Sequence, residues 1–105
     1  MLAVQDVRLD PETGQVWRGD DEIRLARKEL QLLRALMARP GDIVTRGELM
    51  SEVWQTSFYT SSKTIDVHLG WLRRKLGDDP RNPTLITTHR GRGLRFETHA
   101  AGRGA

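Results

Sequence analysis

The residue types that could do chemistry in this chain are mostly cations, and they gather in its second half. The 105 residues carry 17 Lys and Arg against 14 Asp and Glu, for a net charge of +3. Residues 1–60 hold 8 Lys and Arg against 10 Asp and Glu, whereas residues 61–105 hold 9 against 4. This asymmetry favours a polyanionic partner for the second half. The alternative is an unevenly charged, solvated surface.

Groups suited to catalysis or metal binding are sparse. The three histidines have no spacing that would place two of them on one helix face to hold a metal ion. Ser61 and Ser62 have no evident base and orienting carboxylate, and residues 91–93 lack the rest of a phosphate-binding fingerprint. The chain has no cysteine, so disulfides and thiolate metal sites are excluded. We therefore expect no enzyme, no metal and no cofactor.

The densest group of cations lies on the segment from Ser61 to Leu76, which the apolar spacing predicts to be a helix. The serines at its start can cap it, and Gly77 can end it. At about 100° per residue, four apolar residues form one narrow stripe that we expect to be buried. They are Ile65, Leu69, Leu72 and Leu76. The rest of the surface carries Lys63, Thr64, Asp66, Val67, Gly70, Trp71, Arg73, Arg74 and Lys75.

This outer face has four cations and one carboxylate, where an ordinary surface helix would pair Glu with Lys. Gly70 in mid-helix costs about 1 kcal/mol relative to Ala, which suggests that a partner uses the missing side chain. A DNA major groove accounts for these features, because cations reach phosphates or guanine edges and Val67 can touch a thymine methyl. The alternative is a solvated basic helix with a tolerated glycine.

A second basic element is predicted near the C-terminus. Leu85–Thr88 and Leu94–Phe96 are β-prone, which predicts a hairpin with a basic tip between them. Arg90, Arg92 and Arg95 sit around two glycines, which suits a mobile tip that places a guanidinium in a DNA minor groove. The alternative is a solubilising hairpin.

Other parts of the chain supply elements that would hold this helix and hairpin. Alternating apolar residues within 7–25 predict a small antiparallel meander. Apolar spacing predicts an amphipathic helix from Ala26 to about Arg39, then a very short strand at Ile43-Val44. Thr45 and Glu48 form a capping box that begins a second helix.

One domain accounts for nearly all of the chain. Residues 1–98 suffice for a single core, whereas 99–105 have nothing to bury and predict a disordered tail. No apolar run approaches the roughly 18 residues of a spanning helix. The predicted strands and helices indicate an α+β domain, and the composition is typical of a cytoplasmic domain with no membrane contact. No long apolar stripe is left over, so we expect a monomer in the absence of DNA.

Several motifs in this order resemble the OmpR/PhoB-type response regulators. Lys63-Thr64-Ile65-Asp66-Val67-His68-Leu69, with Leu72-Arg73-Arg74-Lys75-Leu76, resembles the recognition helix. Arg90-Gly91-x-Gly93-x-Arg95-Phe96 resembles the wing. Leu25-x-x-x-Glu29-Leu30-x-Leu32-Leu33 and Val44-Thr45-Arg46-x-x-Leu49 resemble the first two helices. The resemblance implies a winged helix-turn-helix fold with an N-terminal antiparallel β-meander, three helices and a C-terminal β-hairpin wing.

The resemblance also implies a function, the effector domain of a two-component transcriptional regulator. Such a domain binds double-stranded DNA sequence-specifically, as a head-to-tail dimer on tandem direct repeats. Helix 61–76 would enter the major groove and wing 89–95 the minor groove. A receiver domain normally precedes it, and its pattern is absent from this chain. RNA polymerase is implied as a further partner.

The resemblance and the residue argument together give the candidate sites. The DNA-binding positions are Lys63, Thr64, Val67, His68, Trp71, Arg73, Arg74, Thr88, Arg90 and Arg92. The polymerase-contacting loop is Trp54, Gln55, Thr56, Ser57, Phe58, Tyr59 and Thr60. The main alternative function is a winged-helix protein–protein interaction module, which exposed aromatic residues such as Trp54 and Trp71 would favour.

The chain departs from the family pattern at a few positions. Gly70-Trp71 stands where many members carry Arg or another polar residue, so Trp71 would pack on a sugar or a thymine methyl instead. Ala26 replaces the usual Thr cap of the first helix, which removes about 1 kcal/mol and would leave Glu29 without a reciprocal partner. His89 and Leu94 replace a more usual Val and Tyr around the wing.

Overall fold

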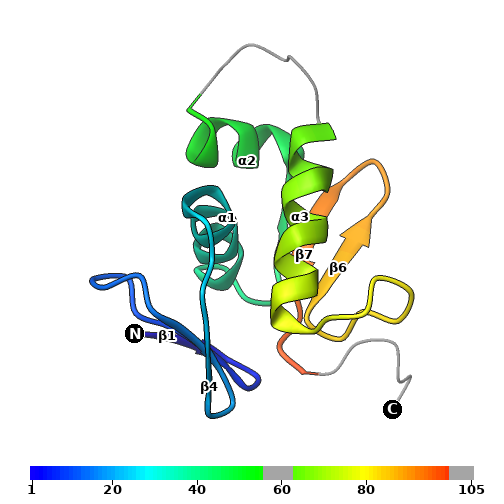
Figure 1. Cartoon of the computed structure of the whole chain (residues 1–105). Helices are drawn as coiled ribbons and strands as arrows, with labels where there is room; N and C mark the ends of the chain where they lie inside the picture. The colour runs from blue at the N-terminus through cyan, green and yellow to red at the C-terminus, as the bar shows by residue number, and fades with distance from the viewer. Residues whose placement is uncertain (56–62, 100–105) are drawn as a thin grey trace.

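A computed structural model of the chain describes residues 1–55 and 63–99. Four short strands come first, followed by a helix, a two-residue strand, two more helices and a hairpin (Figure 1). The elements are β1 (Leu2–Val4), β2 (Val7–Leu9), β3 (Val16–Arg18), β4 (Asp21–Ile23), α1 (Arg27–Met37), β5 (Ile43–Val44), α2 (Arg46–Val53), α3 (Lys63–Leu76), β6 (Ile86–His89) and β7 (Gly93–Phe96). This arrangement confirms the predicted α+β winged helix-turn-helix fold.

The N-terminal meander is a four-stranded antiparallel sheet in the order β1-β2-β3-β4. Val7, Leu9 and Val16 are fully buried, as the alternation predicts. The first strand was missed in the sequence. It pairs with β2 through a tight turn in which Gln5 has φ 52°, and this turn lacks the usual Asn-Gly or Asp-Gly signature.

α1 lies at the centre of the molecule and packs against α2, α3, β7 and β1. Leu32, Leu33 and Leu36 are fully buried on it, because the amphipathic spacing turns one face to the core. Figure 1 shows α2 across one end of α1, and the meander lies toward the other end. The helix ends at Met37, two residues before the predicted end.

The ends of the helices are tied to other elements by cations. Arg18 of β3 donates from Nη1 to the carbonyl of Leu76, 2.5 Å away, at the end of α3. Lys28 of α1 donates to the carbonyl of Val53 at 2.7 Å, at the end of α2. The last carbonyls of a helix have no intrahelical partner, so these bonds satisfy them and fix the helices relative to one another.

The first helix confirms one prediction at its start and corrects another. Ala26 provides no side-chain cap, as expected. Glu29, however, is not without a partner, because its Oε1 accepts from the Ala26 N–H at 2.9 Å and from Lys75 Nζ at 2.7 Å. The second bond exists because α3 runs beside α1, which the local sequence does not reveal.

The predicted capping box at the start of α2 is confirmed. Thr45 Oγ1 accepts from the Glu48 N–H at 3.1 Å, and Glu48 Oε1 accepts from the Thr45 N–H at 3.0 Å. The pKa of the Glu48 carboxyl is lowered, most by its hydrogen bond with the Thr45 backbone and next by the Thr45 side chain. At pH values above its ordinary pKa, ionised Glu48 therefore stabilises the fold. This contribution is lost as the pH falls through the lowered pKa.

Thr45→Ala is expected to lower the free energy of unfolding by about 1 kcal/mol, because one N–H at the start of α2 loses its acceptor. Urea denaturation of both proteins measures the difference. Thr88→Ala, at an exposed position of β6, is the matched control and should change the value little. A Thr45→Ala protein as stable as the control would contradict a capping role.

The C-terminal sheet has the order β5-β7-β6, so β7 is its central strand. Gly93 has φ 151°, and a Cβ there would lie 2.1 Å from the carbonyl oxygen of Val44. The prediction that both wing glycines serve a mobile tip is therefore wrong for Gly93, whose missing side chain lets β7 approach β5. Gly91, with φ 75° and open space around it, forms the turn itself.

Some predictions fall on residues that the structure does not describe. They are the helix caps Ser61 and Ser62, loop residues Thr56 to Thr60, and positions 100–105 of the predicted tail. Within the described ranges, no helix is long and apolar enough to span a membrane.

Candidate nucleic-acid interface

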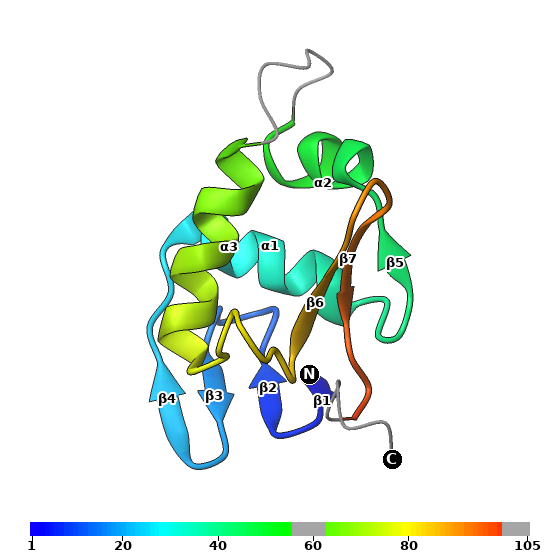
Figure 2. The same cartoon turned by 90° about the vertical axis from the view of Figure 1, so that its right-hand side faces the viewer.

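α3 has two faces of opposite character, as predicted. Ile65, Leu69, Leu72 and Leu76 are buried, which confirms the inner stripe. Figure 2 shows α3 and the β6–β7 hairpin beside each other on one side of the molecule. The outward positions of α3 include Lys63, Asp66, Val67, Gly70, Trp71 and Arg74.

The outer face of α3 is hollowed beside Gly70. A groove of about 490 Å³ is lined there by Asp66, Val67, Gly70, Trp71, Arg73, Arg74 and Pro80. Apart from Gly70, its two neighbours and the adjacent backbone of α3, no atom of the described residues lies within 4 Å of the place where a Cβ of Gly70 would stand. Packing against these residues therefore does not require the glycine, and this part of the α3 surface is open.

The prediction that Arg73 lies on the exposed face is wrong. Its side chain is only 10% exposed, and Nη2 donates to the carbonyl of Ile86 at 2.7 Å. Nε lies 4.0 Å from the Asp78 carboxylate. Burial lowers the pKa of the guanidinium, and the charge of Asp78 opposes that shift. Arg73 borders the apolar stripe of the helix, and its guanidinium reaches the first residue of β6.

Asp78 is a structural residue that the sequence did not reveal. Its carboxylate is fully buried and accepts from three backbone N–H groups at the start of the hairpin. Oδ1 accepts from Thr84 at 2.8 Å and Leu85 at 3.1 Å, and Oδ2 accepts from Ile86 at 3.0 Å. The local sequence does not distinguish it from its exposed neighbour Asp79. Asp78 therefore joins the end of α3 to β6.

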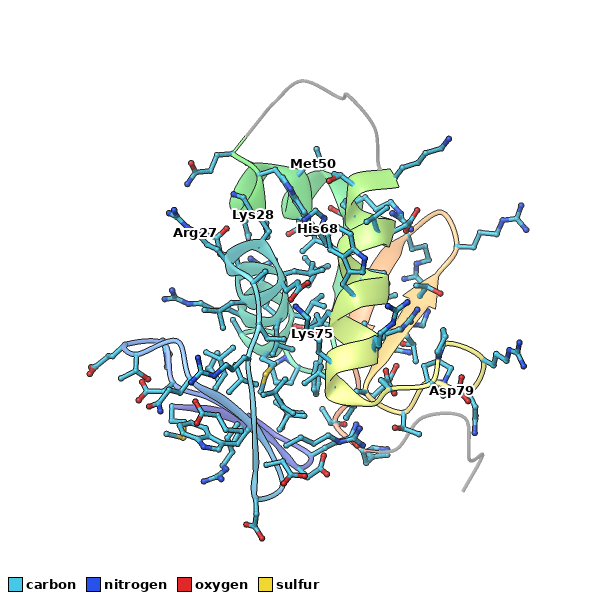
Figure 3. The ribbon with its side chains drawn as sticks, in the orientation of Figure 1. Arg27, Lys28, Met50, His68, Lys75 and Asp79 are labelled. Atoms are coloured by element: carbon cyan, nitrogen blue, oxygen red, sulfur yellow. The ribbon has the colours of Figure 1, made fainter. Side chains whose placement is uncertain are left out.

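Lys75, which the sequence predicted to be an outward cation, instead pairs with a residue of α1. Although partly exposed, it donates to buried Glu29 of α1, and Figure 3 shows it on the side of α3 that faces α1. Asp66 pairs with Arg46 of α2, whose Nη2 lies 2.8 Å from Oδ1. The recognition-helix cations exposed on the outer face are thus Lys63 and Arg74.

His68 is half-buried between two tryptophans. Its ring centroid lies 5.2 Å from that of Trp54 and 5.0 Å from that of Trp71, both in edge-to-face geometry. Nδ1 lies 2.7 Å from the carbonyl of Thr64, which can only accept, so Nδ1 carries the proton. Figure 3 shows His68 toward the end of α3 that lies near α2.

Two residues of the predicted polymerase-contacting loop are described. Trp54 forms the C-cap of α2 and packs against the core, so the expectation that it is exposed is wrong. Gln55 is exposed with φ 53°.

The wing presents three of its candidate residues to solvent. Thr88, Arg90 and Arg92 are exposed, and the Arg92 N–H donates to the carbonyl of His89 at 2.8 Å to close the turn. Arg95 is directed to Glu97 instead of the tip, because its Nε donates to Glu97 Oε2 at 3.0 Å. Burial acts to raise the pKa of Glu97, but its bond from Thr87 and the nearby Arg95 outweigh that effect and lower it.

A family model described as the C-terminal domain of transcriptional regulatory proteins matches residues 20–96. The chain belongs to the OmpR/PhoB-type DNA-binding domains of response regulators. Because this family consists of transcription-factor domains, the chain is not an enzyme. Within the described residues, no group of three or more potential ligands could hold a metal ion.

Curated relatives of this OmpR/PhoB-type domain are longer proteins. The transcriptional regulatory protein TcrA of Mycobacterium tuberculosis is 44% identical over 95 residues, which cover 90% of this chain and 37% of TcrA. The regulatory protein for alkaline phosphatase synthesis SphR of Synechococcus elongatus is 39% identical over 96 residues, covering 91% of this chain and 37% of SphR. The chain thus spans little more than a third of the length of these relatives.

Two solved DNA-binding domains share the fold over nearly their whole length. The DNA-binding domain of Klebsiella pneumoniae RstA, in complex with the RstA box, has a TM-score of 0.87 and 27% identity. That match covers 92% of this chain and 96% of the RstA chain. The DNA-binding domain of E. coli CpxR has a TM-score of 0.83 and 30% identity, covering 94% and 97% of the two chains.

Proposed function

We propose that this OmpR/PhoB-type domain binds double-stranded DNA sequence-specifically, as the effector domain of a two-component transcriptional regulator. The observation that carries the proposal is the exposed face of α3, with its cations, apolar side chains and open glycine, beside a basic wing (Figure 2). A helix of this width fits a major groove. The similar RstA domain was solved in complex with its DNA box, which supports the same activity here.

The proposed contacts follow from the exposed residues and from Thr64, which is half-buried. Lys63 and Arg74 contact phosphates or guanine edges, Thr64 contacts the backbone or a base, and Val67 contacts a thymine methyl. On the wing, Thr88 contacts the backbone. Arg90 and Arg92 enter the minor groove, where a narrow A·T-rich stretch attracts a guanidinium.

The larger assembly is part of the same proposal. The family resemblance supports a head-to-tail dimer on tandem direct repeats, with a receiver domain elsewhere in the whole protein and function in the cytoplasm. The segment 54–60 is proposed to contact RNA polymerase. Its first residue, Trp54, anchors that segment to the core at the end of α2.

Arg74→Ala is expected to weaken binding to a selected duplex about tenfold and to reduce the slope of log affinity against log salt by about 1, because one phosphate contact is lost. Titrations between about 50 and 200 mM salt measure both quantities. Arg34→Ala, at an exposed position of α1, is the matched control and should change neither. Equal effects of the two substitutions would place DNA on another face, and binding insensitive to salt would exclude the phosphate contacts.

Arg90→Ala is expected to reduce the preference for A·T-rich flanks while leaving the bases read by α3 unchanged, because the wing and the helix occupy different grooves. Selection of sites from a random library with each protein measures this preference. The same selection with the unaltered domain defines the binding site. Unchanged flank preference in the variant would remove Arg90 from the minor groove.

A further inference from the structure

Trp71 and Val67 form an apolar strip on a face that is otherwise polar. They stand one helical turn apart, each with 46% of its surface exposed. Gly70 leaves open space beside them, and the same groove is bordered by Asp66 and Arg74. Among the described residues, Met1 is the one other large hydrophobic residue that is comparably exposed. The strip thus coincides with the face proposed to meet DNA.

Trp71 packs against the ring of His68, which in turn packs against Trp54. Its indole meets the edge of His68 at 5.0 Å, and His68 in turn meets Trp54 at 5.2 Å. The bond from His68 Nδ1 to the Thr64 carbonyl fixes the imidazole within α3, and Trp54 is anchored to the core. A side chain ordered before binding loses little rotamer entropy when it binds. The contact with His68 therefore restricts the orientation of the Trp71 ring before DNA is bound.

The chemistry of the strip limits what it can recognise on DNA. Valine has no polar side-chain atom, and an indole has a single donor and no acceptor. The edges of base pairs in the major groove carry hydrogen-bonding groups and one apolar group, the 5-methyl of thymine. An apolar strip in that groove is therefore complementary to thymine methyl groups.

We infer that Trp71, positioned by His68 and Trp54, is a specificity-determining residue that reads thymine 5-methyl groups in the major groove. The inference rests on the proposed function, because it requires α3 to lie in that groove. Trp71 touches the base, whereas His68 and Trp54 act through Trp71. His68 is thus a positioning residue instead of the phosphate contact that its place in the recognition motif implies.

The test uses duplexes that differ in single methyl groups. The unaltered domain first selects a duplex from a random library, and this duplex is resynthesised with each thymine in turn replaced by deoxyuridine, which lacks the 5-methyl group. The unaltered domain should lose about fourfold in affinity for each methyl that is buried against the strip. Trp71→Ala should bind the thymine and deoxyuridine duplexes equally at one or more of these positions.

Two controls separate reading from folding. Trp17→Ala removes an indole from the N-terminal sheet, where it lies under the Arg8 guanidinium, and should keep the full discrimination. His68→Ala should lose most of the discrimination, and His68→Phe, which keeps a ring between the tryptophans, should restore it. A purely structural role for His68 would lower affinity for both duplexes and leave their ratio unchanged. Thermal melts confirm that each variant is folded.

The outcomes distinguish this inference from the function on which it rests. If no thymine is sensitive to the loss of its methyl while Arg74→Ala still weakens binding, the inference fails and DNA binding stands. Discrimination that survives in Trp71→Ala would assign the methyl contact to another residue, and it would leave Trp71 available for a protein partner. A domain that binds no duplex even at low salt would overturn the proposed function itself.

Discussion

Asp78→Ala is expected to lower the free energy of unfolding by about 3–5 kcal/mol, a large part of the stability of a small domain. The carboxylate is buried and accepts from the N–H groups of Thr84, Leu85 and Ile86. Without it, these N–H groups lose their acceptor, and the buried Arg73 guanidinium loses its counter-charge. Urea denaturation followed by circular dichroism measures the change.

Asp79→Ala is the matched control, because the two aspartates are adjacent and differ in burial. Asp79 is exposed, and the one bond described for its carboxylate is from the nearby Arg81 N–H at 2.9 Å, so the loss of this side chain should cost well under 1 kcal/mol. Asp78→Asn should fall between the two, since an amide keeps one accepting oxygen and loses the charge. Equal stability of the two alanine variants would show that the buried carboxylate does not hold the hairpin to α3.

Gly70→Glu is expected to reduce affinity for the selected duplex at least about 100-fold, because it places a carboxylate against phosphates and acceptor-rich base edges. The fold should tolerate the change, since no atom of the described residues lies within 4 Å of the new Cβ. Glutamate is also a better helix former than glycine, so the unfolding free energy should rise by about 0.5–1 kcal/mol. Titration with the duplex and urea denaturation give the two numbers.

Glu52→Gln and Gly70→Ala help to interpret that result. Glu52→Gln changes the charge by one unit in the opposite direction, at an exposed position of α2 that pairs with Arg39, so it measures how far net charge alone alters affinity. Gly70→Ala adds a methyl group without charge and should weaken binding less than Gly70→Glu if the backbone approaches DNA closely. Full affinity of Gly70→Glu would show that this face of α3 does not contact DNA.

The site was predictable where local spacing defines it. The period of the apolar residues determined which side of α3 is buried, so the outward positions of Lys63, Val67, Trp71 and Arg74 followed from the same wheel. The capping box of Thr45 and Glu48 was equally predictable from the sequence, because both partners lie within one helical turn. These features need no knowledge of what packs nearby.

The errors at the site have a common origin in contacts between distant segments. Arg73 lies at the edge of the stripe, where a helical wheel alone places it outward, yet it is buried and donates to the Ile86 carbonyl of β6. The sequence predicted Lys75 to be one more outward cation, but its ammonium group pairs with Glu29, 46 positions earlier in the chain. Three-dimensional packing therefore reduced the basic face that the sequence suggested.

What the sequence determined by itself was the order of the elements after β1, the inner and outer faces of α3 and the basic character of the wing. These depend on periodicity and on turn and cap residues, which act within a few positions. Only the tertiary structure decided that Asp78 joins the helix to the hairpin, that Gly93 admits β7 beside Val44, and that His68 holds Trp71. A buried group takes whatever partner packing brings within reach, and that partner is set by the whole fold.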